Sequence, residues 1–185
     1  MHLKYLLSLI AQALDTEPPQ AILDYCVPFY SPYYHLMYLL AKESAYALCV
    51  ECGVESGRGS FSMLLGGARV IGIDNNPDRK DVLKDNENFQ MIIGTSTDVP
   101  QAVRDAGRQI SVLHVDTEHN FTQAKNEFEA YKPYLKDGAI VLFDDTNAME
   151  GEVLRYLNSL PYEKFVDDRL HPSCGFGGLI YNEAL

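Results

Sequence analysis

Positive charge is scarce in this sequence. Only 15 of the 185 residues are lysine or arginine, against 26 aspartate or glutamate, and the formal net charge is −11. The one adjacent basic pair, Arg79 and Lys80, is flanked by Asp78 and Asp81, so no basic strip interrupts the acidic balance. Because such a surface repels a polyanionic backbone, we expect no nucleic acid partner.

Long apolar runs are also lacking. No run approaches the roughly 20 apolar residues that a membrane-spanning helix needs, so we expect no membrane partner. The apolar stretch at residues 1–14 is short, and it is followed by Asp15 and Glu17 without a small-residue cleavage site. Its helical spacing predicts an amphipathic helix rather than a signal peptide, with an apolar face of Leu3, Leu6, Leu7, Ile10 and Leu14.

Cysteine is sparse, with four residues at positions 26, 49, 52 and 174. The pair Cys49-x-x-Cys52 raises zinc or redox chemistry. Both residues lie on an apolar, strand-like run, however, and no second pair completes a zinc site. We therefore expect buried, unpaired thiols and a cytoplasmic protein.

What is present is an alternation of strands and helices. The apolar runs predict strands at 47–52, 69–74, 89–94, 110–116 and 139–145, and two more within 162–182. Helical patterns occupy 34–40, 60–65, 78–86, 98–106, a long segment from 121 that Gly138 ends, and 151–159. Asn120 and Gln123 form a capping-box pattern at the start of the long helix.

This order predicts an α/β fold, in which a doubly wound, mostly parallel sheet of seven strands has helices on both faces. The two closing strands predict an antiparallel hairpin at the C-terminal edge. We expect one core domain over 34–185, preceded by a helical and aromatic appendage over 1–33. The aromatic side chains of 28–38 would line a pocket, form a homodimer contact or pack against the sheet.

Polar side chains stand at the carboxyl end of each predicted core strand, where open parallel sheets bind ligands. The strand ends carry Glu51 with a glycine loop, Asp74-Asn75, Thr95-Ser96, Asp116 followed by His119, and Asp144-Asp145. We therefore expect a ligand site along this edge of the sheet.

The glycine loop has the spacing G-x-x-x-G-x-G at Gly53, Gly57 and Gly59, which differs from the nicotinamide fingerprint G-x-G-x-x-G. Glu51 and Glu55 make the loop acidic, and its one basic residue is Arg58. The loop thus suits a ligand without phosphate and with a cationic end, and Asp74 stands where a carboxylate takes ribose hydroxyls. The alternative is a strand-to-helix turn without a ligand.

The pattern Glu51-x-Gly53-x-x-x-Gly57-x-Gly59, followed by Asp74, resembles motifs I and II of class I S-adenosylmethionine-dependent methyltransferases. The resemblance covers about residues 30–182 and implies a Rossmann-like fold. It implies that residues 53–59 hold the methionine portion of the cofactor, with Glu51 as a carboxylate on the cofactor side. The other cofactor residues that it implies are Asp74 and Asn75 at the ribose, Thr95 and Ser96 near the adenine, and Asp116.

Three carboxylates are expected to converge, because strands four and five are neighbours in this fold. Asp116, Asp144 and Asp145 would repel one another unless one is protonated or a cation lies between them. Three carboxylates suit Mg²⁺. The alternative is that Asp116 only contacts the cofactor while Asp144 or Asp145 caps the next helix.

The stretches HVDTEHNF and LFDDT resemble the metal-dependent O-methyltransferases of the catechol, macrolide-sugar and cephalosporin-tailoring types. The resemblance implies that Asp116, Asp144 and Asp145 bind Mg²⁺ and that Asp116 takes part in catalysis. His119 stands where the catechol type has a basic lysine, and an imidazole can accept a hydroxyl proton near neutral pH. The alternative for His119 is packing at a helix start. We expect His35 and His171 to be structural or exposed.

The leading hypothesis is therefore an S-adenosylmethionine-dependent methyltransferase that uses Mg²⁺ to methylate a hydroxyl of a small molecule. One alternative is a module that binds S-adenosylmethionine without methyl transfer. Another is a nicotinamide-dependent oxidoreductase, which the loop spacing and the lack of a Tyr-x-x-x-Lys motif disfavour.

Overall fold

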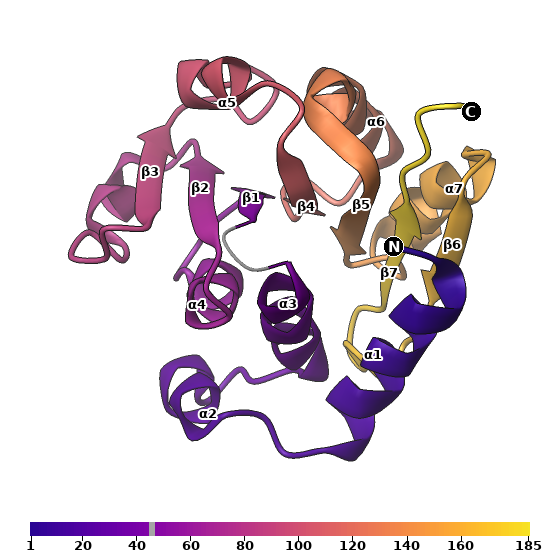
Figure 1. The fold of residues 1–185 in the computed structure, drawn as a ribbon, viewed down its shortest axis with the longest axis horizontal. Coiled ribbons are helices and arrows are strands. Elements are labelled where there is room, and N and C mark those ends of the chain that lie inside the picture. The colour runs from indigo at the N-terminus through magenta and orange to yellow at the C-terminus, as the bar shows by residue number, and fades with distance from the viewer. Residues whose placement is uncertain (45–46) are drawn as a thin grey trace.

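A computed structural model describes residues 1–44 and 47–185 and confirms the predicted α/β fold. Seven strands of the described chain form one sheet in the order β3-β2-β1-β4-β5-β7-β6 (Figure 1). Strand β7 pairs antiparallel with β5 and β6, and the other pairs are parallel. The strands are β1 (Leu48–Cys52), β2 (Arg69–Asp74), β3 (Phe89–Ile93), β4 (Ile110–Val115), β5 (Leu135–Asp144), β6 (Glu163–Val166) and β7 (Phe176–Ile180).

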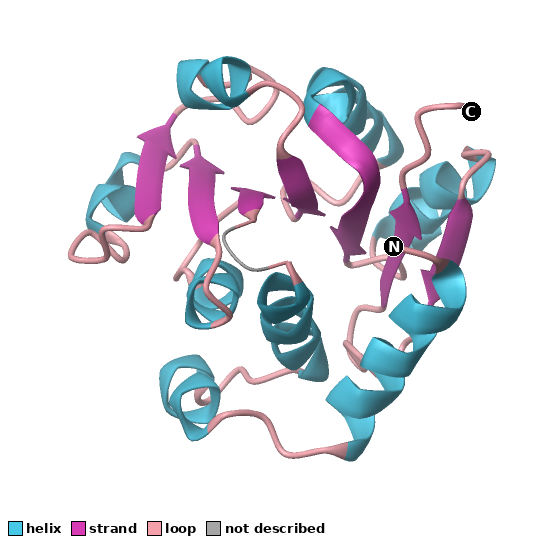
Figure 2. Ribbon diagram, viewed as in Figure 1, coloured by secondary structure: helices cyan, strands magenta, loops and turns pink. Residues whose placement is uncertain are grey.

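Helices cover both faces of the sheet (Figures 1 and 2). One face carries α1 (Leu3–Asp15), α2 (Gln20–Cys26), α3 (Pro32–Glu43) and α4 (Arg58–Leu65). The other face carries α5 (Gln101–Ala106), α6 (Phe121–Tyr131) and α7 (Glu152–Ser159). Each layer encloses its own cluster of buried apolar side chains. None of the described helices combines the length and the apolar character needed to cross a bilayer.

The two cysteines of the C-x-x-C pattern lie on opposite faces of β1. Cys49 packs in the cluster beneath α1–α4, whereas Cys52 packs in the cluster beneath α5–α7. Burial raises the pKa of Cys49 to about 12 and that of Cys52 well above its usual value. Both thiols are free and buried, as predicted, because side chains three apart on a strand point away from each other.

One predicted helix is absent, and the predicted end of another is wrong. Residues 78–86 contain only a short 3₁₀ turn, η1 (Pro77–Asp81), because this polar segment has too few apolar residues to bury a helical face. The long helix ends at Tyr131 and is followed by the 3₁₀ turn η2 (Lys132–Tyr134). Gly138 lies inside β5, where its φ of +77° accompanies a register shift against β4, so this glycine forms a strand irregularity rather than a helix end.

Helix α1 confirms the N-terminal helix prediction but with a different buried face. Leu6, Leu9, Ile10 and Ala13 are buried, whereas Leu7 is 47% exposed. The buried side chains belong to the same apolar cluster as residues of the sheet, including Val112. The spacing therefore predicts the helix correctly, and contact with the sheet decides which side of it is covered.

Substitutions in α1 test whether segment 1–33 unfolds together with the sheet. Leu6→Ala is expected to lower the free energy of unfolding by about 2–4 kcal/mol, because Leu6 is fully buried. Its neighbour Leu7 provides the matched control, and Leu7→Ala is expected to cost less than about 1 kcal/mol. Urea unfolding followed by circular dichroism measures both. Two outcomes would contradict a single cooperative unit. One is an equal loss of unfolding free energy in both variants, and the other is a separate early unfolding transition in Leu6→Ala alone.

Candidate active site

A cavity of about 760 Å³ lies at the carboxyl ends of the parallel strands, where the sequence placed the ligand site. Its walls come from the strand-end loops of β1–β5, from the segment before and within α3, and from the loop before β7. The predicted site residues that line it are Gly53, Asp74, Asn75, Thr95, Ser96, Asp116, His119, Asp144 and Asp145.

The loop after β1 is clamped by Asp74 at the end of β2. One carboxylate oxygen, Oδ2, accepts hydrogen bonds from the backbone N–H groups of Val54 at 3.1 Å and Glu55 at 3.0 Å. The other oxygen, Oδ1, accepts one from the N–H of Asn76 at 2.8 Å. Asp74 thus sets the conformation of the loop that lines the cavity, and it also lines the cavity itself.

The loop has left-handed backbone at three positions, Gly53, Glu55 and Gly57. Gly53 has a φ of +86°, and a Cβ there would lie 1.7 Å from the backbone oxygen of Asp116. Glu55, at the position where the resembling family often has glycine, has a φ of +50°. Side chains adopt this region rarely, which explains why glycine is common at that position in the family.

Three predicted cofactor residues do not reach the cavity. Glu51 is only 2% exposed: one of its oxygens lies 3.1 Å from His114 Nδ1, and Ser60 Oγ donates to the other. Gly57 and Gly59 are needed for packing, since a Cβ at Gly59 would lie 2.0 Å from the Glu51 carboxylate. The structure therefore places Glu51 behind the loop and not on the ligand side.

The Asp74 clamp can be tested directly. Asp74→Asn replaces one acceptor oxygen with an NH₂ group that faces backbone N–H donors, and it removes the negative charge. We expect a loss of about 1–3 kcal/mol in unfolding free energy, and at least tenfold weaker S-adenosylhomocysteine binding by calorimetry, on the order of 1.4 kcal/mol. Asp78→Asn changes an exposed carboxylate four residues further on and should leave both unchanged. Wild-type affinity in Asp74→Asn would show that the loop keeps its shape without the clamp.

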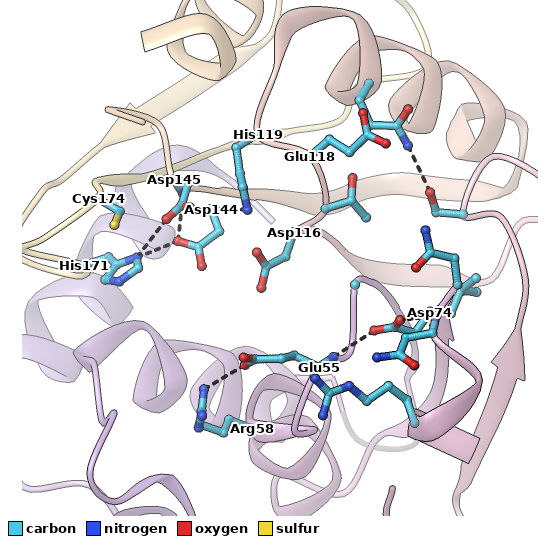
Figure 3. Close-up of a pocket in the computed structure, with 18 of the residues that line it drawn as sticks. Glu55, Arg58, Asp74, Asp116, Glu118, His119, Asp144, Asp145, His171 and Cys174 are labelled. Atoms are coloured by element: carbon cyan, nitrogen blue, oxygen red, sulfur yellow. Dashed lines mark hydrogen bonds and ion pairs between the residues drawn. The ribbon is translucent and has the colours of Figure 1, made fainter. Parts of the chain in front are cut away.

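The acidic residues at the ends of β4 and β5 converge in the cavity, but not as one set of three. Figure 3 shows Asp116 between the Asp74 side and the group formed by Asp144 and Asp145. His171 Nδ1 lies 2.7 Å from Asp144 Oδ1 and 3.7 Å from Asp145 Oδ1. Among the described residues, two groups of side chains have ligand atoms within 4.8 Å of one another. One group is His114 with Asp116 and Asp144, and the other is Asp145 with His171 and Cys174.

Ionisation within this cluster is strongly perturbed. Burial and the charge of Asp144 raise the pKa of Asp116 well above its usual range. Burial alone would raise the pKa of Asp144, but the hydrogen bond to His171 and the charges of His114 and His171 outweigh it and lower the pKa. Burial opposes protonation of His114, but the bond to Glu51 and the charges of Asp116 and Asp144 raise its pKa to about 9. The cluster therefore favours positive charge at its centre.

His119 lies at the start of α6 and lines the cavity, as predicted. Its Nε2 is 3.4 Å from Asp145 Oδ2, and the side chain is partly exposed. Both residues have φ values near +50°, an unfavourable conformation for residues other than glycine. This pair places an imidazole beside the acidic cluster with access to a ligand.

Sequence reasoning missed two groups of site residues. His171, expected to be structural or exposed, and Cys174 line the cavity from the loop before β7. Glu127 on α6 is fully buried and accepts hydrogen bonds from Ser96, Thr117 and Gln123, so it ties two strand-end loops to the helix. Gln123 therefore does not complete the predicted capping box, although Asn120 Oδ1 does accept from its N–H at 2.8 Å. The sequence did contain one sign of the role of Glu127, because this glutamate lies four residues after Gln123 on the apolar face of the helix.

The N-terminal segment supplies another wall. Phe29, Tyr33 and Tyr34 line the cavity, and Tyr33 also packs on Phe176 with ring centroids 4.8 Å apart. The Arg58 guanidinium lies over the Phe29 ring at 4.9 Å. The aromatic stretch of 28–38 thus contributes to both the pocket and the core. His35, in contrast, is buried with Nδ1 3.3 Å from the backbone oxygen of Ala13, so it has a structural role.

The donor set fits a divalent cation. Asp116 and Asp144 offer carboxylate oxygens, and the buried Nε2 of His114 has no hydrogen-bond partner among the residues that the structure describes. A cation bound by the two carboxylates would give this buried nitrogen the partner that it lacks.

Comparison with known proteins identifies the family. A family model described as a methyltransferase domain matches residues 50–146, just over half of the chain. CalS11, a TDP-rhamnose 3′-O-methyltransferase of calicheamicin biosynthesis, is 16% identical with a TM-score of 0.64, over 97% of this chain and 94% of that one. A methyltransferase from Geobacter sulfurreducens is 18% identical with a TM-score of 0.61, over 94% and 88%.

A third similar structure is MycE, a methyltransferase of mycinamycin biosynthesis in complex with Mg and SAH. It is 16% identical with a TM-score of 0.64, over 90% of this chain and 55% of that one. Comparison with curated proteins finds no match. The chain belongs to the methyltransferase family that the model describes, and its fold is that of the class I S-adenosylmethionine-dependent methyltransferases.

Proposed function

We propose that the chain transfers a methyl group from S-adenosylmethionine to a hydroxyl oxygen of a small molecule in a reaction that depends on a divalent cation. One observation carries this proposal. A single cavity is lined by the Gly53 loop and by the acidic cluster, and Figure 3 shows Glu55 and Asp74 on one side of it and Asp144, Asp145 and His119 on the other. A cofactor on the first side would present its methyl group toward an acceptor held on the second.

Each wall has a part in this proposal. The backbone at Gly53 and the Asp74 carboxylate would hold the methionine and ribose portions, with Asn75, Thr95 and Ser96 along the nucleoside. The match to the methyltransferase family and the Asp74 geometry support this placement. The chain's main contribution to rate would be the orientation of two bound reactants.

On the acceptor side, Asp116 and Asp144 would hold the cation, with Asp145 close by. A bound divalent cation would lower the pKa of the acceptor hydroxyl. His119 Nε2, which lies 3.4 Å from Asp145 Oδ2, would accept the hydroxyl proton. Phe29 and Tyr34 would cover the rest of the acceptor and exclude water.

Binding and turnover test the proposal together. We expect S-adenosylhomocysteine to bind by calorimetry, and methyl-labelled S-adenosylmethionine to label acceptors that carry two adjacent hydroxyls only when Mg²⁺ or Mn²⁺ is added. Binding without labelling of any such acceptor would favour the module that does not transfer methyl groups. Undiminished labelling in the presence of a chelator would show that the reaction needs no divalent cation. Failure of S-adenosylhomocysteine to bind would overturn the whole proposal.

A further inference from the structure

The buried histidine on β4 has a ring nitrogen without a partner. His114 lies on β4, two residues before Asp116, and is 1% exposed. Its Nδ1 is 3.1 Å from Glu51 Oε1, whereas its Nε2 has no hydrogen-bond partner in the described parts of the chain. A buried polar atom left unpaired costs about 1–3 kcal/mol, so it calls for a physical reason.

The surroundings of the ring resemble those of a metal-ligating histidine. Such a histidine usually donates its second ring N–H to a carboxylate, which fixes the tautomer and directs the other lone pair at the metal. Glu51 occupies the position of that carboxylate, and Ser60 Oγ in turn donates to Glu51. In the parallel register of β1 and β4, Glu51 stands opposite His114, so the contact is built into the sheet.

Two carboxylates complete the set. His114, Asp116 and Asp144 each offer one ligand atom, and these atoms all lie within 4.8 Å of one another. Ligand atoms held at about 2.1 Å from one ion lie roughly 3–4 Å apart, so small side-chain rotations suffice to close the site. Asp145 is not in this set, because it faces His119 and His171.

We propose that His114 Nε2 is a ligand of the divalent cation, together with Asp116 and Asp144, and that the site therefore favours Mn²⁺ over Mg²⁺. Mg²⁺ prefers oxygen ligands, whereas imidazole nitrogen suits the divalent transition metals. This inference rests on the proposed function, because it assigns the ligands of the same cation.

The direct test uses Mn²⁺ as the probe in chelator-treated protein saturated with S-adenosylhomocysteine. Electron spin echo envelope modulation is expected to show a directly coordinated ¹⁴N, which changes to a ¹⁵N signal when the histidines are ¹⁵N-labelled. The signal should persist in His119→Asn and His171→Asn and disappear in His114→Gln. The wild-type and the two control variants keep the test valid if His114→Gln does not fold.

Affinity gives a second readout. Calorimetry is expected to show that His114→Gln weakens Mn²⁺ binding by about 10–100-fold and changes Mg²⁺ binding much less. Bound Mn²⁺ without nitrogen coupling, or coupling lost in His119→Asn or His171→Asn, would overturn the role of His114 and leave the proposed function intact. If S-adenosylhomocysteine binds but Mn²⁺ does not, the cation and this inference both fail while the methyltransferase site remains.

Discussion

Asp116→Asn is expected to lower kcat/KM for methyl transfer by about 10²–10³-fold. Asp116 lies between the cofactor side of the cavity and the group around Asp144 (Figure 3). It shares one candidate ion site with His114 and Asp144, so the substitution removes both a ligand atom and a charge that attracts the cation. The loss is expected in kcat and in the dependence on metal, because Asp116 would act on the acceptor hydroxyl through the cation.

Binding measurements separate this role from damage to the cofactor side. S-adenosylhomocysteine binding by calorimetry should weaken by less than about tenfold in Asp116→Asn, on the order of 1.4 kcal/mol. Asp168→Asn removes an exposed carboxylate that does not line the cavity and should behave as wild type. Retention of metal-stimulated turnover in Asp116→Asn would contradict the assignment of Asp116. A large loss of S-adenosylhomocysteine binding would instead place Asp116 mainly against the cofactor.

Gly53→Ala is expected to lower the free energy of unfolding by about 3 kcal/mol or more and to abolish S-adenosylhomocysteine binding. Two costs combine at this position. The φ of +86° is unfavourable for alanine, and the new Cβ would lie 1.7 Å from the backbone oxygen of Asp116. The backbone of one strand end would have to move away from the other, and both ends line the cavity.

Gly67→Ala is the matched control for the conformational cost. Gly67 has a φ of +92°, but a Cβ there meets nothing within 4 Å. This control should therefore lose only about 1–2 kcal/mol and keep its S-adenosylhomocysteine affinity. Denaturant unfolding and calorimetry on both variants give the comparison. If Gly53→Ala were no less stable than Gly67→Ala, the close approach of the two strand ends would not constrain the loop.

Local patterns predicted the elements that bury a regular apolar face. The core strands are short apolar runs between turn residues, and α6 begins directly after Asn120, whose side chain caps the helix as predicted. The failures have local causes as well. Residues 78–86 had helix-forming residues but no apolar stripe, and Gly138 served a strand irregularity instead of a helix end. Propensity alone could not separate these cases, because contact with the sheet decides them.

The direction of each carboxylate could not be predicted from its position. Glu51 was placed toward a ligand by its place before the glycine loop, yet it turns to His114, a residue 63 positions away. That contact depends on the parallel register of β1 with β4. His171 reaches Asp144 because the antiparallel pairing of Asp144 with Phe176 brings the loop before β7 to the end of β5. Neither pairing leaves a mark in the local sequence.

The sequence by itself determined the alternation of strands with helices in the core, the loop at Gly53 with its spacing, and the strand ends that carry Asp74, Asp116 and Asp144. These follow from periodicity and from the rule that parallel strands present their carboxyl ends at one edge. Only the tertiary structure decided which groups share that edge with them, namely Glu51 behind the loop, His114 beneath Asp116, and His171 against Asp144. The physical reason is that strand register and side-chain burial are set by contacts between segments far apart in the chain.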